Sequence, residues 1–94
     1  MGFVARGKRS KPVELVLYRR EGCHLCEEMR AVVDLVLRDG VGIPATLREV
    51  DISRHPDLEA AYGEQIPVLL VNGRKAFKFR LTEEALRERL RRNA

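Results

Sequence analysis

The sequence has no tryptophan, two tyrosines, three phenylalanines and only two cysteines among its 94 residues. Aromatic side chains this few and this scattered do not provide a stacking platform for nucleic-acid bases, so we expect no nucleic-acid partner. Two cysteines close together also differ from the disulfide framework of small secreted domains. This cysteine pattern favours a reducing compartment, and we expect a cytoplasmic protein.

The sequence also lacks a long hydrophobic run. No apolar stretch approaches the roughly 18–20 residues that span a bilayer. The apolar residues 1–5 are too short for the hydrophobic region of a signal peptide, and Arg6 stands where a myristoylation signal has Ser or Thr. We therefore expect no membrane partner.

The net charge of +4 comes from one end of the chain. Four basic residues and no acidic residue lie within residues 1–12, and the rest of the chain has 14 basic and 14 acidic residues. We predict that residues 1–12 form a flexible basic tail, with binding of a polyanion as the alternative. Residues 13–94 are long enough for a single domain with one modest core.

Apolar patterning and turn residues predict seven elements in this domain. A long helix runs from Cys23 until Gly40 stops it, a short helix opens at 55–57 and closes at Gly63, and a last helix follows the N-cap Thr82. Strands are predicted at 13–18, 45–52, 66–71 and 74–80.

The order of these elements defines an α/β fold. The first strand is apolar almost throughout, which predicts burial on both of its faces. A right-handed crossover makes the first two strands parallel, and Asn72-Gly73 predicts a hairpin between the last two. The expected fold is βαβαββα, a mixed four-stranded sheet flanked by three helices.

Cys23 and Cys26 are the candidate catalytic residues. Their spacing brings two sulfurs together on one helical turn, directly after a predicted buried strand. The N-terminus of a helix stabilises the thiolate, which is the reactive form of cysteine, and Arg19 and Arg20 just upstream add positive charge. We therefore expect Cys23 to attack a disulfide and the less exposed Cys26 to resolve the mixed disulfide.

Other interpretations of these residues remain open. The two cysteines can be ordinary small apolar residues, and His24 either tunes the Cys23 thiolate or is simply exposed. A zinc site needs four ligands, and the chain adds only His24 and His55, so we expect no metal within one chain. A metal or iron–sulfur cluster shared by two chains is the alternative.

Pro67 lies within an apolar run that reads as a central strand, where proline removes a ladder hydrogen bond. A cis peptide between Ile66 and Pro67 would bend the chain at the entrance of the strand. It would leave the Ile66 backbone beside the dithiol to pair with an extended substrate. A trans proline at the first residue of the strand is the alternative.

The Cys23-His24-Leu25-Cys26 motif after a strand, together with the segment 66–74, resembles the glutaredoxin-like family of thioredoxin-fold proteins. The likeness covers residues 13 to about 92. It implies that Pro67 is cis and packs against the dithiol, and that Cys23 and Cys26 are the nucleophilic and resolving cysteines. Typical glutaredoxins have Pro-Tyr between the cysteines, Thr-Val before the proline and a later Gly-Gly pair. This chain has His24-Leu25, Gln65-Ile66 and no Gly-Gly at 79–82, so it is most similar to the Cys-His-Leu-Cys branch.

The sequence therefore predicts a thiol–disulfide oxidoreductase that acts on a protein or low-molecular-weight disulfide. We expect a monomer with no tightly bound cofactor; glutathione stays open as the reductant, because its binding motif is incomplete. A metal carrier made of two chains and a non-catalytic adaptor that uses the Arg-rich last helix are the rival functions. The expected substrate-binding residues are Ile66, Pro67, Arg19, Arg20 and His24.

Overall fold

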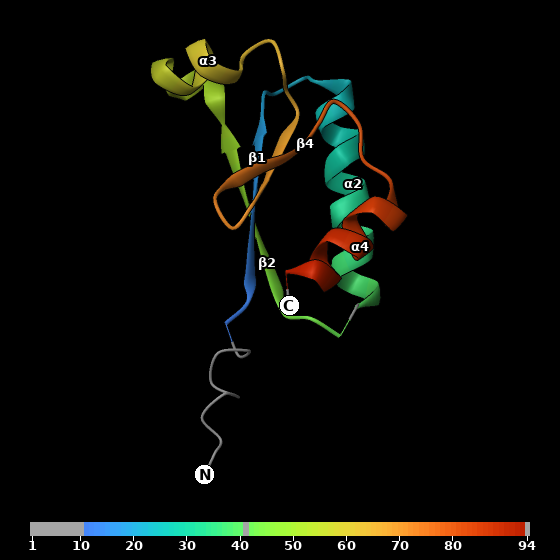
Figure 1. Ribbon diagram of the computed structural model, residues 1–94. Coiled ribbons are helices and arrows are strands. Elements are labelled where there is room, and N and C mark those ends of the chain that lie inside the picture. Colours follow the sequence, from blue (N-terminus) through green and yellow to red (C-terminus); the bar gives the residue numbers. More distant parts are fainter. Residues whose placement is uncertain (1–10, 41, 94) are drawn as a thin grey trace.

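The computed structural model describes residues 11–40 and 42–93 (Figure 1). Most of the predicted basic tail, residues 1–10, lies outside the described residues. Among the described residues, the first element is β1, which starts at Val13.

The predicted element order is confirmed. The strands are β1 (Val13–Arg19), β2 (Ala45–Asp51), β3 (Val68–Val71) and β4 (Arg74–Lys78), and the α-helices are α2 (His24–Asp39), α3 (Pro56–Tyr62) and α4 (Glu83–Arg92). A 3₁₀ helix, η1 (Ile52–Arg54), which the periodicity did not predict, joins β2 to α3. Its N-cap is Asp51, whose carboxylate accepts hydrogen bonds from the backbone N–H and the hydroxyl of Ser53 at 3.0 and 2.7 Å.

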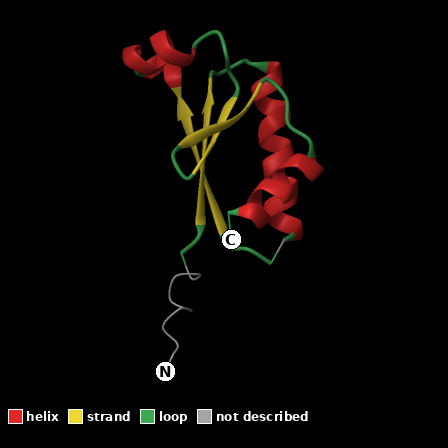
Figure 2. Cartoon of the chain, viewed as in Figure 1, coloured by secondary structure: helices red, strands yellow, loops and turns green. Residues whose placement is uncertain are grey.

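The sheet has the strand order β2-β1-β3-β4. β1 pairs with β2 in parallel and with β3 antiparallel, and β3 and β4 form the expected antiparallel hairpin. Asn72 and Gly73 both have positive φ, 51° and 86°, as a two-residue hairpin turn requires. Helices α2 and α4 lie side by side against one face of the sheet, and α3 lies apart from them near one end of the strands (Figures 1 and 2).

The hydrophobic core lies between the sheet and the pair α2 and α4. Val13, Leu15 and Leu17 of β1 are buried there against residues of both helices, among them Val33 and Leu86. The expectation that β1 is buried on both faces was wrong: on its other face Glu14 is exposed and Val16 and Tyr18 are half-buried. Helix α3 contacts that face through Tyr62, whose ring centroid lies 5.0 Å from that of Tyr18.

Local capping explains where the helices start and stop. Cys23 is the N-cap of α2, and Gly40 is its C-cap with a φ of 80°. Thr82 is the N-cap of α4, and its hydroxyl accepts the Ala85 backbone N–H at 3.1 Å, as its residue type predicts. The N-cap at Cys23 therefore starts α2 soon after β1 ends at Arg19.

Candidate functional site

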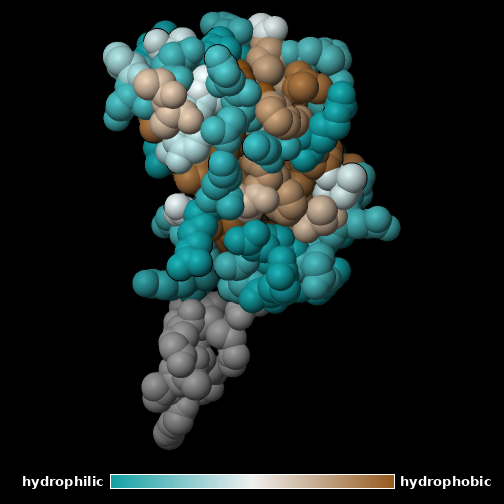
Figure 3. Space-filling view, turned by 45° about the horizontal axis from the view of Figure 1, so that its top comes forward, coloured by the Kyte–Doolittle hydropathy of each residue, from teal (hydrophilic) through white to brown (hydrophobic). Residues whose placement is uncertain are grey.

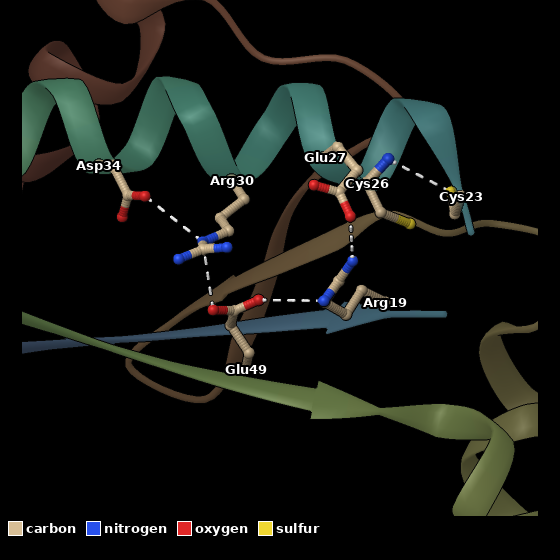
Figure 4. A network of polar contacts seen from close by, with 7 residues as sticks. All are labelled: Arg19, Cys23, Cys26, Glu27, Arg30, Asp34 and Glu49. Atoms are coloured by element: carbon tan, nitrogen blue, oxygen red, sulfur yellow. Dashed lines mark hydrogen bonds and ion pairs between the residues drawn. The ribbon is translucent and has the colours of Figure 1, made fainter. Parts of the chain in front are cut away.

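Cys23 lies at the end of the connection between β1 and α2, directly before the first residue of the helix. Its backbone is extended, and its Sγ accepts the backbone N–H of Cys26 at 3.2 Å (Figure 4). A sulfur at this position faces the unpaired N–H groups and the positive end of the helix dipole, which favour negative charge. Cys23 is half-buried, so a partner can still reach it.

Cys26 lies one turn further along and is fully buried, with 0% of its surface exposed. Burial raises the pKa of the Cys26 thiol to about 11, and the hydrogen-bonded Cys23 sulfur adds to the rise. A backbone hydrogen bond from Arg20 and the positive charge of Arg19 act in the opposite direction. Both cysteines are free thiols, so the structure describes the reduced form.

Arg19 is held between the sheet and α2. Its guanidinium lies 2.8 Å from Glu27 of α2 and 3.5 Å from Glu49 of β2. Glu49 in turn contacts Arg30 at 3.3 Å, and Arg30 contacts Asp34 at 3.4 Å. Figure 4 shows this chain of charges running along the side of α2 that faces the strands, starting beside the cysteines.

Arg20, the other predicted substrate-binding arginine, points elsewhere. Its guanidinium forms an ion pair with Glu59 of α3 and lies 3.4 Å from the carbonyl oxygen of Gly63. Arg20 contacts Cys23 through its backbone: the Arg20 carbonyl oxygen accepts the Cys23 N–H at 3.3 Å. The two arginines are therefore not brought together.

The side chain of His24 is 85% exposed, and its Nε2 lies 2.8 Å from Glu28 of the same helix. Arg80 lies 3.9 Å from the other oxygen of Glu28. His24 thus sits on the outer surface of α2. His55 is also exposed, and its side chain makes no capping hydrogen bond to α3.

The Ile66–Pro67 peptide is cis, which confirms the expectation taken from the family resemblance. Pro67 is buried and precedes β3, which begins at Val68 and not at residue 66. Its carbonyl oxygen accepts the backbone N–H of Phe79 at 2.8 Å, so the entrance of β3 is tied to the end of β4.

A groove beside the first turns of α2 was not predicted. It has a volume of about 190 Å³, and its most exposed large apolar side chain is Phe79, at 41% exposed. Figure 3 shows hydrophobic surface gathered at that end of the molecule within a mostly hydrophilic surface. The groove is lined by Leu25, Glu28, Met29, Val32 and residues 79–82.

Glu27 and Glu49 were also missed as parts of the site. The alternation of β2 contained a signal for Glu49, because Glu49 shares a face with the inward Leu47 and lies opposite Leu17 in the parallel register. Glu27 follows Cys26 directly, but an acidic residue in the first turn of a helix is so common that it marked no site.

Within residues 11–40 and 42–93, no three or more His, Cys, Asp or Glu side chains come together as a metal-binding group. Over the same residues, no helix is both long and apolar enough to cross a membrane.

Comparison with known proteins agrees with this geometry. Residues 14–91 match the family model described as glutaredoxin-like domain (DUF836). The protein Ne2328 from Nitrosomonas europaea, solved by NMR, is similar with a TM-score of 0.71 and 29% identity over 85% of this chain and 93% of its own. The X-ray structure of XcR50 from X. campestris is similar with a TM-score of 0.68 and 32% identity over 83% of this chain and 96% of its own.

A thioredoxin variant from Halobacterium salinarum shares the fold, with a TM-score of 0.63 and 21% identity over 90% of this chain and 77% of its own. No curated protein sequence matches the chain. The fold is therefore thioredoxin-like, with the Cys23–Cys26 pair at the start of its first helix.

Proposed function

The chain belongs to the glutaredoxin-like domain family (DUF836), and from this premise we propose that it is a thiol–disulfide oxidoreductase. Cys23 is the nucleophile and Cys26 the resolving cysteine. The observation that carries the proposal is the difference between the two sulfurs: Cys23 is half-buried at the helix N-cap, whereas Cys26 is buried one turn behind it.

The reaction needs two exchanges. The Cys23 thiolate attacks one sulfur of a substrate disulfide, a Cys23–substrate S–S bond forms, and the other substrate sulfur leaves and takes up a proton. Cys26 then loses its proton and attacks the Cys23 sulfur. The Cys23–Cys26 disulfide forms, the remaining substrate sulfur leaves as a thiol, and the substrate has gained two electrons.

The surroundings of Cys23 support an extended substrate. The backbone of Ile66, ahead of β3, is the group that would pair with such a substrate, since strand-like pairing gives affinity without demanding a sequence. The groove lined by Leu25 and Phe79 adds apolar surface for the residues next to the substrate cysteine. The substrate class is a disulfide in a protein or peptide, or in a low-molecular-weight thiol such as glutathione.

Substitution of each cysteine tests the proposal. With insulin as the disulfide substrate and dithiothreitol as the electron source, Cys23→Ser is expected to lose the acceleration of insulin reduction completely. Mixed with insulin in the absence of dithiothreitol, which would itself reduce a mixed disulfide, Cys26→Ser is expected to stop after the first exchange, with a covalent insulin adduct on Cys23 that mass spectrometry detects. Full reductase activity in the Cys23→Ser variant would contradict the proposal.

A further inference from the structure

We propose that Arg19 is a positioning residue for the second exchange: its cation, held between α2 and the sheet, stabilises the Cys26 thiolate as that thiolate forms and attacks Cys23. The inference rests on the proposed function and adds to it a residue that acts through Cys26 without touching the substrate.

The first argument is the fixed position of the guanidinium. Arg19 is the last residue of β1, and its side chain is only 20% exposed. Two carboxylates from different elements hold it, Glu27 at 2.8 Å and Glu49 at 3.5 Å. In Figure 4 the Arg19 side chain rises from β1 and the Cys26 side chain descends from α2 into the same space between helix and sheet.

The second argument is an unused donor. The Nε of Arg19 is buried and has no hydrogen-bond partner among the described residues. Buried polar groups in proteins nearly always have a partner, so one without a partner needs an explanation. A thiol is a weak acceptor, whereas a thiolate is a strong one. In this proposal, the missing acceptor of the Nε–H is the Cys26 thiolate, which forms only during the second exchange.

The third argument is the difficulty of the step that Arg19 would assist. Burial is the main cause that raises the pKa of the Cys26 thiol, to about 11 in the reduced protein, so loss of the Cys26 proton is unfavourable at neutral pH. A cation in a poorly solvated space stabilises such an anion much more strongly than a cation in water. Among the described residues, the ionisable groups that act on Cys26 are Arg19 and Cys23, while Glu27 of α2 and Glu49 of β2 contact the Arg19 guanidinium.

The two carboxylates that contact Arg19 also affect the charge that Cys26 experiences. Glu27 and Glu49 fix the guanidinium, but they also offset part of its charge. Removal of one carboxylate lets the Arg19 guanidinium stabilise the Cys26 thiolate more strongly. Removal of Arg19 leaves the negative charges of Glu27 and Glu49 without compensation, which disfavours the thiolate. Substitutions of Arg19 and Glu27 must therefore move the titration of the second exchange in opposite directions.

The test isolates the second exchange. The reduced protein is mixed rapidly with 5,5′-dithiobis(2-nitrobenzoate), which puts a thionitrobenzoate group on Cys23, and attack by Cys26 then releases that group as a second coloured thiolate. The rate of this second release is followed against pH. For Arg19→Gln we expect the midpoint to move up by about one pH unit and the rate at pH 7 to fall about tenfold. Arg19→Lys recovers part of the rate, and Glu27→Gln lowers the midpoint.

Arg87→Gln is the matched control. The Arg87 side chain is 24% exposed and also contacts two carboxylates, Asp39 at 3.2 Å and Glu83 at 3.6 Å, but it lies at the other end of α2. Its substitution should lower thermal stability as much as Arg19→Gln does and leave the midpoint in place. An unchanged midpoint in Arg19→Gln, or equal shifts in Arg19→Gln and Arg87→Gln, overturns the inference. A wild-type protein that releases only one thionitrobenzoate overturns the proposed function itself.

Discussion

Cys23 and Cys26 are three residues apart and have the same side chain, yet their surroundings give them different chemistry. Cys23 receives the N–H of Cys26 at 3.2 Å at the start of the helix and can be reached from outside. Cys26 is fully buried, and its raised pKa keeps the thiol protonated at neutral pH. The proposed division into a nucleophilic and a resolving thiol rests on this difference over one turn of helix.

The raised pKa of Cys26 predicts how the stability of the reduced protein depends on pH. The folded state holds the Cys26 proton up to about pH 11, whereas the unfolded chain releases it near pH 9.0. The unfolded state thus binds fewer protons above pH 9, and the stabilisation present below pH 9 is lost as pH rises toward 11, by about 2–3 kcal/mol in all.

This loss is measured by denaturant unfolding of the reduced wild type and of Cys26→Ala at several pH values. The difference between the two free energies of unfolding should narrow across that window, because only the wild type carries the buried thiol. Parallel curves would show that Cys26 titrates as it does in the unfolded chain.

At the same scale, the sequence predicted the cysteine pair at the start of the helix but not which arginine lies beside it. Arg19 and Arg20 were equivalent in the sequence, because both precede the motif. Alternation along β1 separates them: Arg19 shares a face with Leu17 and meets Glu27, whereas Arg20 turns to Glu59 of α3. The ion-pair partners of the two arginines lie on other elements of the fold, and the local sequence around the motif contains no signal for these distant contacts.

The elements were predicted best where the signal is local. Thr82 caps α4, Gly40 ends α2, and Asn72 and Gly73 turn the hairpin, each through the backbone geometry that its residue type favours. The error at β1 has a non-local cause. An apolar strand is buried on both faces only if helices cover both, and the short α3 covers only part of the second face.

The cap of α4 makes a prediction at this scale. In Thr82→Ala the Ala85 N–H loses the hydroxyl that it contacts at 3.1 Å, which should lower the free energy of unfolding by about 1 kcal/mol. For a domain of this size, that loss corresponds to a fall in Tm of roughly 4–8 °C. Thr82→Ser keeps the hydroxyl and should stay close to wild type in thermal unfolding. Equal losses in both variants would assign the effect to the Thr82 methyl group and not to the cap.

In the whole molecule, the sheet and the helix pair α2 and α4 pack together (Figure 2), and the dithiol lies at the N-terminal end of α2. The ion pairs of Arg19 with Glu27 and Glu49 lie at this same end, as does the hydrogen bond between the Phe79 N–H and the Pro67 carbonyl oxygen. The family match spans residues 14–91, so the thioredoxin-like fold accounts for nearly all of the described chain. The length and composition of the sequence predict one domain, because no second core fits into 94 residues.

The central claim is that Cys23 and Cys26 form one reversible redox couple. Equilibration of the protein in glutathione buffers of graded potential, followed by alkylation and mass spectrometry, measures this most directly. The account predicts that both thiols disappear together in a single two-electron transition, with a tenfold change in the ratio of forms for about every 30 mV, and that glutathione appears on Cys23 only transiently. A protein that never forms the Cys23–Cys26 disulfide, and instead keeps Cys26 as a thiol while glutathione stays on Cys23, would contradict the claim.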